Sequence, residues 1–347
     1  MADSILTSPS SGAPSDAGDA IRGAGDFLRF LERHHPEEVL RIDRPIDPKE
    51  CEHAALEEYL AQRNRQPWIV FENVKTLSGE RWPGLFTNYC STSVRRLAIA
   101  YRLDLAKSRP HDLSLKHCEA MAHPEPPERI RGSDAPVKKI VHLGEQARLD
   151  RFPFFRNCER DSRPGWFTPI WIVRELESRR YNISWHRGQY LDPKHTTIRF
   201  YPGRDMYDIF HQHKRAGKPV PVAAVIGHHP AFGSAAGTHF DRLADEYEGA
   251  AGIYRRATGS SLRVTASETW GEELLVPADA EIVVEGYIRD EYTEAGPWCD
   301  YWLNYAPRCS MNIFEATAIT MRERPLFNAV WPATEADSTI QTGAAVL

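Results

Sequence analysis

From Lys138 to about Leu326 the chain repeats one texture, in which short apolar segments rich in β-branched and aromatic residues alternate with turn residues. Segments of this kind predict β-strands. We expect strands in KKIVHL, FTPIWIV, YNISWHR, TTIRFY, VPVAAVIG, LRVTA, EIVVEGYI and ATAITMRE. The helical segments among them are RDMYDIFHQHKRAG and RLADEYEGAAGIYRRATG. Many short strands with few helices favour a β-barrel or sandwich over a doubly wound sheet.

The region before these strands has a different pattern. Apolar residues at helical spacing predict helices in DFLRFLERH and KECEHAALEEYLAQRN, and QPWIVFENV predicts a strand. Another helix, in STSVRRLAIAYRLD, would be capped by Ser91 or Ser93. The predicted fold class is therefore α+β, and the expected order is a disordered tail, a small α/β domain, a Pro-rich charged linker and the strand-rich domain. These correspond to residues 1–25, 26–110, 111–137 and 138–330.

The composition excludes several classes of protein. The chain has 347 residues, is 41% hydrophobic and 26% charged, and carries a net charge of −5, so no global positive field attracts nucleic acid or anionic membranes. No apolar run approaches the roughly 20 residues that a membrane span needs. The six Cys are scattered without a CxxC motif, and the N-terminus lacks the pattern of a secretory signal. We expect free thiols and a cytoplasmic protein.

Local motifs alone do not identify an activity. The sequence contains no GxGxxG, P-loop, HExxH or GxSxG motif. His211 and His213 would point about 200° apart on a predicted helix, which rules out a shared zinc ion. His228 and His229 have no Cys cluster nearby, and we interpret all four histidines as surface or capping residues.

The segment NISWHR presents an unusual charge. Strand alternation divides its side chains between two faces, with Asn182, Ser184 and His186 on one and Ile183, Trp185 and Arg187 on the other. An arginine on an apolar face is costly unless it meets an anion. A structural salt bridge and a binding site are equally consistent with this pattern.

The segment EIVVEGYIRDEYTEAGPWCDYW begins as an apolar strand and is expected to enter a loop that contains Gly296, Pro297 and Asp300. Glu291 and Glu294 would be loop charges in that interpretation. The loop is either an ordinary solvated hairpin end or a device that holds one acid in a dry pocket.

Several stretches occur in the order FLRFLE, VLRIDRPIDPKE, IVFENV, NISWHR, GKPVPVAAVIGHHP, LLVPADAEIVVEGYI and ATAITMRERPLF. Taken together, they resemble the UbiD family of reversible decarboxylases. The resemblance covers roughly residues 26–330 and is nearest to the fungal phenylacrylic (ferulic) acid decarboxylases. It implies a split β-barrel like that of flavin reductases, which binds prenylated FMN made by a separate flavin prenyltransferase. It also implies Mn²⁺ or Mg²⁺, with K⁺ beside it, at the cofactor phosphate, and a possible homodimer.

The resemblance also assigns roles to individual residues. Asn182 and Glu246 match metal ligands, and the ligand between them falls near Asp205. Oxygen ligands suit a hard divalent cation. Thr168 and Ile183 match positions that contact the cofactor.

For the reaction, the resemblance implies reversible, non-oxidative decarboxylation of an aromatic or α,β-unsaturated carboxylic acid. Arg187 matches the arginine beside the flavin ring and the substrate carboxylate, and Asp300 matches the acid that protonates the carbon after CO₂ leaves. Ala295 stands where the family has a glutamate that partners this arginine. Glu294 is one residue away and would replace it as a catalytic group only if the chain bulges here.

The end of the sequence gives the alternative. Family members usually continue into a C-terminal α/β domain with a lysine that contacts the flavin phosphate, whereas this sequence ends at Leu347. We therefore expect that domain to be missing and residues 331–347 to be a tail. The alternative function is a catalytically inactive or truncated homologue that acts as a flavin-binding or interaction module.

Overall fold

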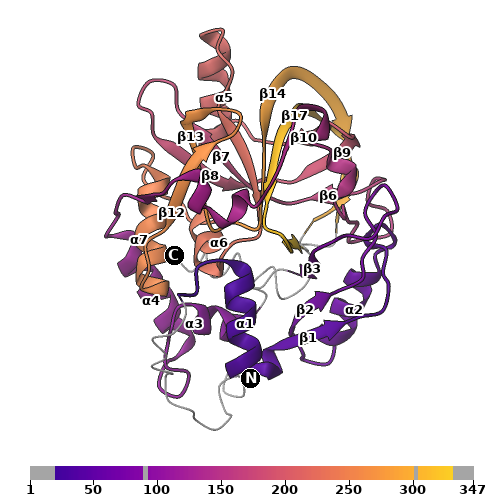
Figure 1. Ribbon diagram of the computed structural model, residues 1–347, viewed down its shortest axis with the longest axis vertical. Coiled ribbons are helices and arrows are strands. Elements are labelled where there is room, and N and C mark those ends of the chain that lie inside the picture. The colour runs from indigo at the N-terminus through magenta and orange to yellow at the C-terminus, as the bar shows by residue number, and fades with distance from the viewer. Residues whose placement is uncertain (1–19, 89–92, 301–303, 331–347) are drawn as a thin grey trace.

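The structure is a computed structural model that describes residues 20–88, 93–300 and 304–330. Figure 1 shows a small sheet and several helices at one end of the molecule and a larger sheet at the other. The α-helices of the described residues are α1 (Ala24–His34), α2 (Glu52–Ala61), α3 (Val94–Ala100), α4 (Pro110–Met121), α5 (Asp205–Arg215), α6 (Pro230–Ala236) and α7 (Glu246–Thr258).

The large sheet confirms the strand-rich reading of the second half of the chain and, with the helices, the α+β class. Its order is β6-β9-β10-β17-β14-β11-β7-β8, with β5 paired to β17. All of these neighbours are antiparallel. Its strands are β5 (Ile140–Leu143), β6 (Trp166–Phe167), β7 (Ile170–Arg174), β8 (Tyr181–Trp185), β9 (Gly188–Asp192), β10 (His195–Ile198), β11 (Val222–Ile226), β14 (Ile282–Ala295) and β17 (Cys309–Met321). Closure of this sheet into a split barrel stays a prediction.

Strand β14 is longer than the sequence pattern predicts. It passes Ile288, where the expected strand ended, and stays paired to β17 as far as Ala295. The register shifts between Glu285 and Gly286, where a Cβ on Gly286 would overlap the carbonyl oxygen of Glu315. A glycine is therefore required at this close approach. The expected loop with its carboxylates is in large part a strand.

The small sheet joins the two ends of the chain. It contains β1 (Val39–Ile42), β2 (Trp68–Phe71), β3 (Leu85–Asn88) and β18 (Leu326–Ala329), in that order. Glu281 is buried beside it and accepts hydrogen bonds from the backbone N–H groups of Gly25 (2.9 Å) and Leu326 (3.3 Å). The small sheet and α1 are thus tied directly to the start of β14, and the expected domain boundaries do not separate independent units.

Residues 111–137, expected to form a linker, contain regular structure. Helix α4 occupies its first part and packs against α7, with the two lying side by side in Figure 1. A side chain at Gly252 on α7 would overlap the carbonyl oxygen of His123, so the glycine permits this close packing. Further along, β4 (Glu128–Arg129) pairs with β12 (Arg263–Ser267), which in turn pairs with β13 (Gly271–Pro277).

Capping residues fix the starts of the helices. Ser93 accepts a hydrogen bond from the backbone N–H of Arg96 (3.4 Å) and caps α3, whereas Ser91 lies outside the described residues. Asp245 caps α7 in the same way. Helix α1 begins inside the expected N-terminal tail, and the rest of that tail before residue 20 and residues 331–347 lie outside the described residues.

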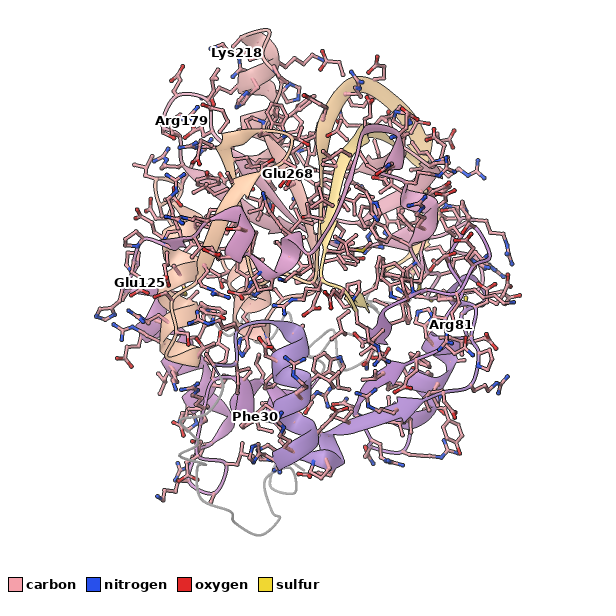
Figure 2. All side chains as sticks on the ribbon, in the orientation of Figure 1. Phe30, Arg81, Glu125, Arg179, Lys218 and Glu268 are labelled. Carbon is pink, nitrogen blue, oxygen red and sulfur yellow. The ribbon has the colours of Figure 1, made fainter. Side chains whose placement is uncertain are left out.

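Charged side chains cover the outside of the molecule in Figure 2, including Lys218 just beyond α5 and Arg81 beside the small sheet. Within the described ranges, no helix has the length and apolar character needed to cross a membrane.

Candidate functional site

The three predicted metal ligands line one cavity of about 180 Å³. Asn182 comes from β8, Asp205 is the first residue of α5, and Glu246 is the first residue of α7. The two carboxylates therefore sit at helix N-termini, where the helix dipole favours negative charge. Arg180 and Arg242 also line the cavity. The structure brings these residues together, and their role as metal ligands stays a prediction.

Glu246 lies in an environment that a cation would improve. Burial, with a smaller contribution from the nearby charges of Asp205 and Asp245, raises the pKa of its carboxyl group to about 7. The backbone N–H of Ile183 (2.6 Å) and the amide of Asn182 donate hydrogen bonds that oppose this shift. In the described part of the chain, no three His, Cys, Asp or Glu side chains form a metal-binding group. The donors here are two carboxylates and one amide oxygen, an oxygen set that suits Mg²⁺ or Mn²⁺.

A row of polar side chains runs from this cavity along β8. Ser184 Oγ lies 3.1 Å from Asn182 Oδ1 and 2.8 Å from His186 Nε2. Strand alternation predicted that these three residues share a face, and the hydrogen bonds confirm it.

Arg187 lies beyond the other end of β8. The strand ends at Trp185, so the alternation that assigned Arg187 to the apolar face does not extend to it. Its guanidinium lies 5.2 Å from the ring centre of Trp298, and its Nη1 donates to the carbonyl oxygen of Cys299 (3.4 Å). The guanidinium of Arg199 lies 4.7 Å from the same ring. Trp298 is thus flanked by two cationic side chains.

Asp300 is the residue after Cys299, whose carbonyl oxygen accepts the hydrogen bond from Arg187. The short strands β15 (Trp298–Cys299) and β16 (Tyr305–Ala306) pair, and beyond them Asp300 and Asn304 bond reciprocally. The backbone N–H of Asp300 donates to the carbonyl oxygen of Asn304 (2.8 Å), and the N–H of Asn304 donates to Asp300 Oδ1 (3.0 Å). Burial raises the pKa of the Cys299 thiol, Asp300 raises it further, and Arg187 lowers it. Arg187 and Asp300 therefore both lie close to Cys299, at the same turn.

Asp161 is a residue of this turn that the sequence did not reveal. Its carboxylate accepts hydrogen bonds from the backbone N–H groups of Asn157 (3.0 Å), Cys158 (3.0 Å) and Cys299 (2.7 Å). It therefore holds the chain segment that carries Asp300. The DSRPG sequence indicates a turn, but nothing in it indicates a partner more than a hundred residues away.

Glu294 does not have the geometry on which its catalytic role depends. Its side chain is 65% exposed and lies 3.7 Å from the guanidinium of Arg308, whereas Ala295 is buried. The pairing of β14 with β17 shows no register shift between Tyr292 and Ala295. The strand thus has no bulge between Tyr292 and Ala295 that would turn Glu294 inward. Regular alternation places the Glu294 side chain on the solvent face.

The two remaining cofactor predictions have little support from contacts. Thr168 lies half-buried in the gap between β6 and β7. The side chain of Ile183 is buried in the core, and its backbone N–H already donates to Glu246. Their contacts with a cofactor stay predictions.

His213, His228 and His229 lie in the interior of the structure. His228 and His229 are buried, which contradicts a surface location, and burial lowers the pKa of each to about 3. His229 Nδ1 accepts a hydrogen bond from the N–H of Ala231 (3.2 Å), which confirms a capping role at α6. His213 is also buried, and its Nε2 lies 3.0 Å from the carbonyl oxygen of Arg174.

A second, much smaller cavity of about 10 Å³ lies between the small sheet and β8, with Trp68 and Trp185 among its walls. Among the described residues, three buried polar atoms of its lining lack a hydrogen-bond partner, namely Thr87 Oγ1, His228 Nε2 and Asn328 Oδ1. The volume admits about one water molecule. This cavity is too small for a flavin ring.

Comparison with known proteins gives a consistent family. The family model described as the UbiD 3-octaprenyl-4-hydroxybenzoate carboxy-lyase Rift-related domain matches residues 128–335, more than half of the chain. An uncharacterized protein of Archaeoglobus fulgidus is 32% identical over 197 residues, which are 56% of this chain and 39% of the relative. The chain thus spans well under half the length of this relative.

Solved structures extend the likeness to nearly the whole chain. An evolved dimeric form of the UbiD-class enzyme HmfF from Pelotomaculum thermopropionicum, in complex with prFMN, is 26% identical with a TM-score of 0.81, over 93% of this chain and 70% of that one. The vanillic acid decarboxylase of Sedimentibacter hydroxybenzoicus, in an open form with truncated ShVdcD, is 23% identical with a TM-score of 0.80, over 92% and 66% of the two chains. The apo 3,4-dihydroxybenzoic acid decarboxylase of Enterobacter cloacae is 19% identical with a TM-score of 0.82, over 94% and 68%. The last two likenesses show the fold alone.

Proposed function

The chain belongs to the UbiD family, and we propose that it catalyses reversible, non-oxidative decarboxylation of an aromatic or α,β-unsaturated carboxylic acid with prenylated FMN. One observation carries the proposal. A single strand, β8, has an oxygen-lined cavity around Asn182 at one end and, beyond the other, Arg187 and Asp300, which both lie close to Cys299. The 26% identical HmfF structure with prFMN supports the choice of cofactor.

The residues at the cavity suit the phosphate end of such a cofactor. Asn182, Asp205 and Glu246 would hold Mn²⁺ or Mg²⁺, with K⁺ nearby, because all three line one cavity and a cation would favour the charged form of the buried Glu246 carboxyl group. Arg180 adds a positive charge to the same wall. When bound, the prenylated flavin would serve as the electron sink for the bond pair that CO₂ leaves behind.

Arg187 binds the substrate carboxylate in this proposal. A guanidinium is always charged and offers two parallel donors to a carboxylate. Its contacts with the Trp298 ring and the Cys299 carbonyl oxygen hold it in one orientation, and positioning of this kind is the protein's main contribution to such a reaction.

Asp300 supplies the proton. As the carbon–carboxylate bond breaks, CO₂ leaves and the carbon keeps the electron pair. The Asp300 carboxyl group then transfers its proton to that carbon and later regains one from solvent. Its reciprocal bonds with Asn304 and the buried Trp298 beside it fix its position and limit access of water.

A specific observation favours a second candidate, a flavin-binding or interaction module without decarboxylase activity. The methyl group of Ala295 occupies a buried position where the resemblance predicts a carboxylate, and Glu294 points to solvent. The residue that the resemblance gives as the orienting glutamate of Arg187 is therefore an alanine here.

Carbon exchange distinguishes the two candidates. The chain would be co-expressed with a flavin prenyltransferase, the expected supplier of its cofactor, and incubated with cinnamic and heteroaromatic acids in ¹³C-bicarbonate. We expect ¹³C to enter the carboxylate of at least one acid, and Arg187→Ala to abolish the exchange. Bound prenylated flavin without exchange in any acid would favour the module. Size-exclusion chromatography of the same sample would test the proposed homodimer.

A further inference from the structure

The polar row at β8 connects the chain just beyond β10 to the cavity. Ser184 Oγ is its centre, 3.1 Å from Asn182 Oδ1 and 2.8 Å from His186 Nε2. At one end the His186 ring bonds to the backbone carbonyl of Arg199. At the other end the Asn182 amide donates to Glu246. Each of the three side chains thus has a partner on both sides.

The row can run in two directions, because a serine hydroxyl has only one proton to donate. In the first direction, His186 Nε2–H donates to Ser184, the hydroxyl donates to Asn182 Oδ1, and the amide NH₂ donates to Glu246. In the second direction, the amide NH₂ donates to Ser184, the hydroxyl donates to His186 Nε2, and Nδ1–H of the ring donates to Arg199. In the structure Ser184 Oγ donates to Asn182 Oδ1 and the amide NH₂ faces Glu246, which is the first direction at this end of the row. In the second direction the amide is turned, so that its carbonyl oxygen faces the cavity.

The Arg199 carbonyl favours the second direction. Burial lowers the pKa of His186 to about 4, so the ring is neutral and carries one N–H. Nε2 faces Ser184, so a proton on Nε2 would leave Nδ1 with only a lone pair to offer the Arg199 carbonyl oxygen. A proton on Nδ1 satisfies both nitrogens.

The second direction also places the Asn182 carbonyl oxygen next to the Glu246 carboxylate. Two oxygens with negative charge repel unless a cation lies between them. Without a cation, the Asn182 amide instead bonds to Glu246 as the structure shows. A divalent cation beside Asn182 and the Arg199 carbonyl beside His186 therefore both favour the second direction.

We propose that His186 is a positioning residue that acts through Ser184 to turn the carbonyl oxygen of Asn182 toward a divalent cation in the cavity. This inference rests on the proposed function, because it requires the cation site. Hydrogen-bond partners behind a metal ligand typically change metal affinity about 10–100-fold. The residues in this role are Ser184, on β8, and His186, which directly follows the strand.

The test is a titration of the protein with Mn²⁺, with and without FMN, in which electron paramagnetic resonance measures the concentration of the free ion. We expect Ser184→Ala and His186→Phe each to weaken Mn²⁺ binding by about 10–100-fold. Ser184→Thr keeps the hydroxyl and should retain wild-type affinity. His186→Gln can donate to Arg199 and accept from Ser184, so it should recover affinity that His186→Phe loses. Circular dichroism and thermal unfolding would establish that each variant is folded.

The outcomes separate this inference from the proposed function. Wild-type affinity in both Ser184→Ala and His186→Phe, with loss of binding in Glu246→Gln, would overturn the positioning role and leave the cation site intact. Absence of Mn²⁺ binding in the wild type, or binding that Glu246→Gln does not change, would overturn both.

A second readout reports the direction of the row itself. In protein labelled with ¹⁵N-histidine and saturated with diamagnetic Mg²⁺, the chemical shifts distinguish the two ring tautomers. We expect His186 to carry its proton on Nδ1, and Ser184→Ala to release this preference. A proton on Nε2 in the Mg²⁺-bound wild type would contradict the proposal.

Discussion

The two ends of β8 differ in how their functional groups are supported. At the cavity end, Asn182, Asp205 and Glu246 stand on a strand and on the first turns of two helices. At the other end, Arg187 and Asp300 stand on irregular chain beyond the strands. The strand and helices that carry the cavity residues follow from local sequence patterns, whereas the turn depends on long-range contacts such as that of Asp161 with Cys299. We therefore expect substitutions at the cavity end to weaken cation binding most, and substitutions at the turn end to lower the rate of catalysis most.

The largest effect should come from the turn end. Asp300→Asn keeps the shape of the side chain and an oxygen for the Asn304 N–H, but it removes the acidic proton. Because general acid catalysis typically contributes about 10²–10⁴-fold, we expect kcat to fall by that factor. Carbon exchange with a turnover substrate would measure it, with flavin and Mn²⁺ content as the control. Normal turnover would show that another group protonates the product.

The cavity end should show its effect in binding. Glu246→Gln removes a charged oxygen ligand but retains an acceptor for the Ile183 N–H. We expect Mn²⁺ affinity to fall by about 100-fold or more. Titration calorimetry with Mn²⁺ would measure this loss. An unchanged Mn²⁺ affinity would mean that the cation binds elsewhere and that the cavity end has no special role in binding.

Acid stability must be known before either end is studied by pH. Burial lowers the pKa of His229 to about 3, against about 6.5 in an unfolded chain. Between these values the unfolded chain binds a proton that the folded chain does not, so the free energy of unfolding decreases as the pH falls below about 6.5. At pH 5 the loss from this group is roughly 2 kcal/mol.

His229→Asn isolates that contribution, because asparagine is also a good helix cap. Urea unfolding at pH 7 and pH 5 should show that the variant loses about 2 kcal/mol less than the wild type on acidification. Any cost of the smaller side chain is present at both pH values and cancels in this difference. Equal losses would mean that His229 becomes protonated without unfolding.

The smallest effect is expected at Glu294. Its side chain is exposed and pairs only loosely with Arg308, and surface substitutions of this kind change stability by at most about 0.5 kcal/mol. Glu294→Gln should therefore leave both unfolding and carbon exchange unchanged. A loss comparable to that of Asp300→Asn would show that β14 shifts its register during the reaction and brings Glu294 inward.

Much of the fold follows from the sequence, and the exceptions have physical reasons. Strand alternation locates most strands of the large sheet, but it cannot show that β14 absorbs register shifts and continues to Ala295. Helix α4 is not predicted, because the prolines and charges that follow it are typical of a linker, although Pro110 itself sits where proline is favoured at the start of a helix. His229 looks like an exposed turn residue, although Phe27 of α1 covers its ring at 5.4 Å.

The candidate site divides in the same way. Alternation alone places Asn182, Ser184 and His186 on one face, and the structure joins them by hydrogen bonds. The gathering of Asn182 with Asp205 and Glu246 came from the family resemblance, because residues so far apart carry no common local pattern. Asp161 was not found, since its role consists of contacts with the backbone of a distant turn.

The measurement that tests the central claim most directly is the cofactor content of the chain after co-expression with a flavin prenyltransferase in the presence of Mn²⁺. Native mass spectrometry, metal analysis and absorption spectroscopy would be applied to the wild type and to Glu246→Gln. We expect one prenylated FMN and one Mn²⁺ per wild-type chain and loss of both in the variant. A folded, soluble wild type without flavin would contradict it.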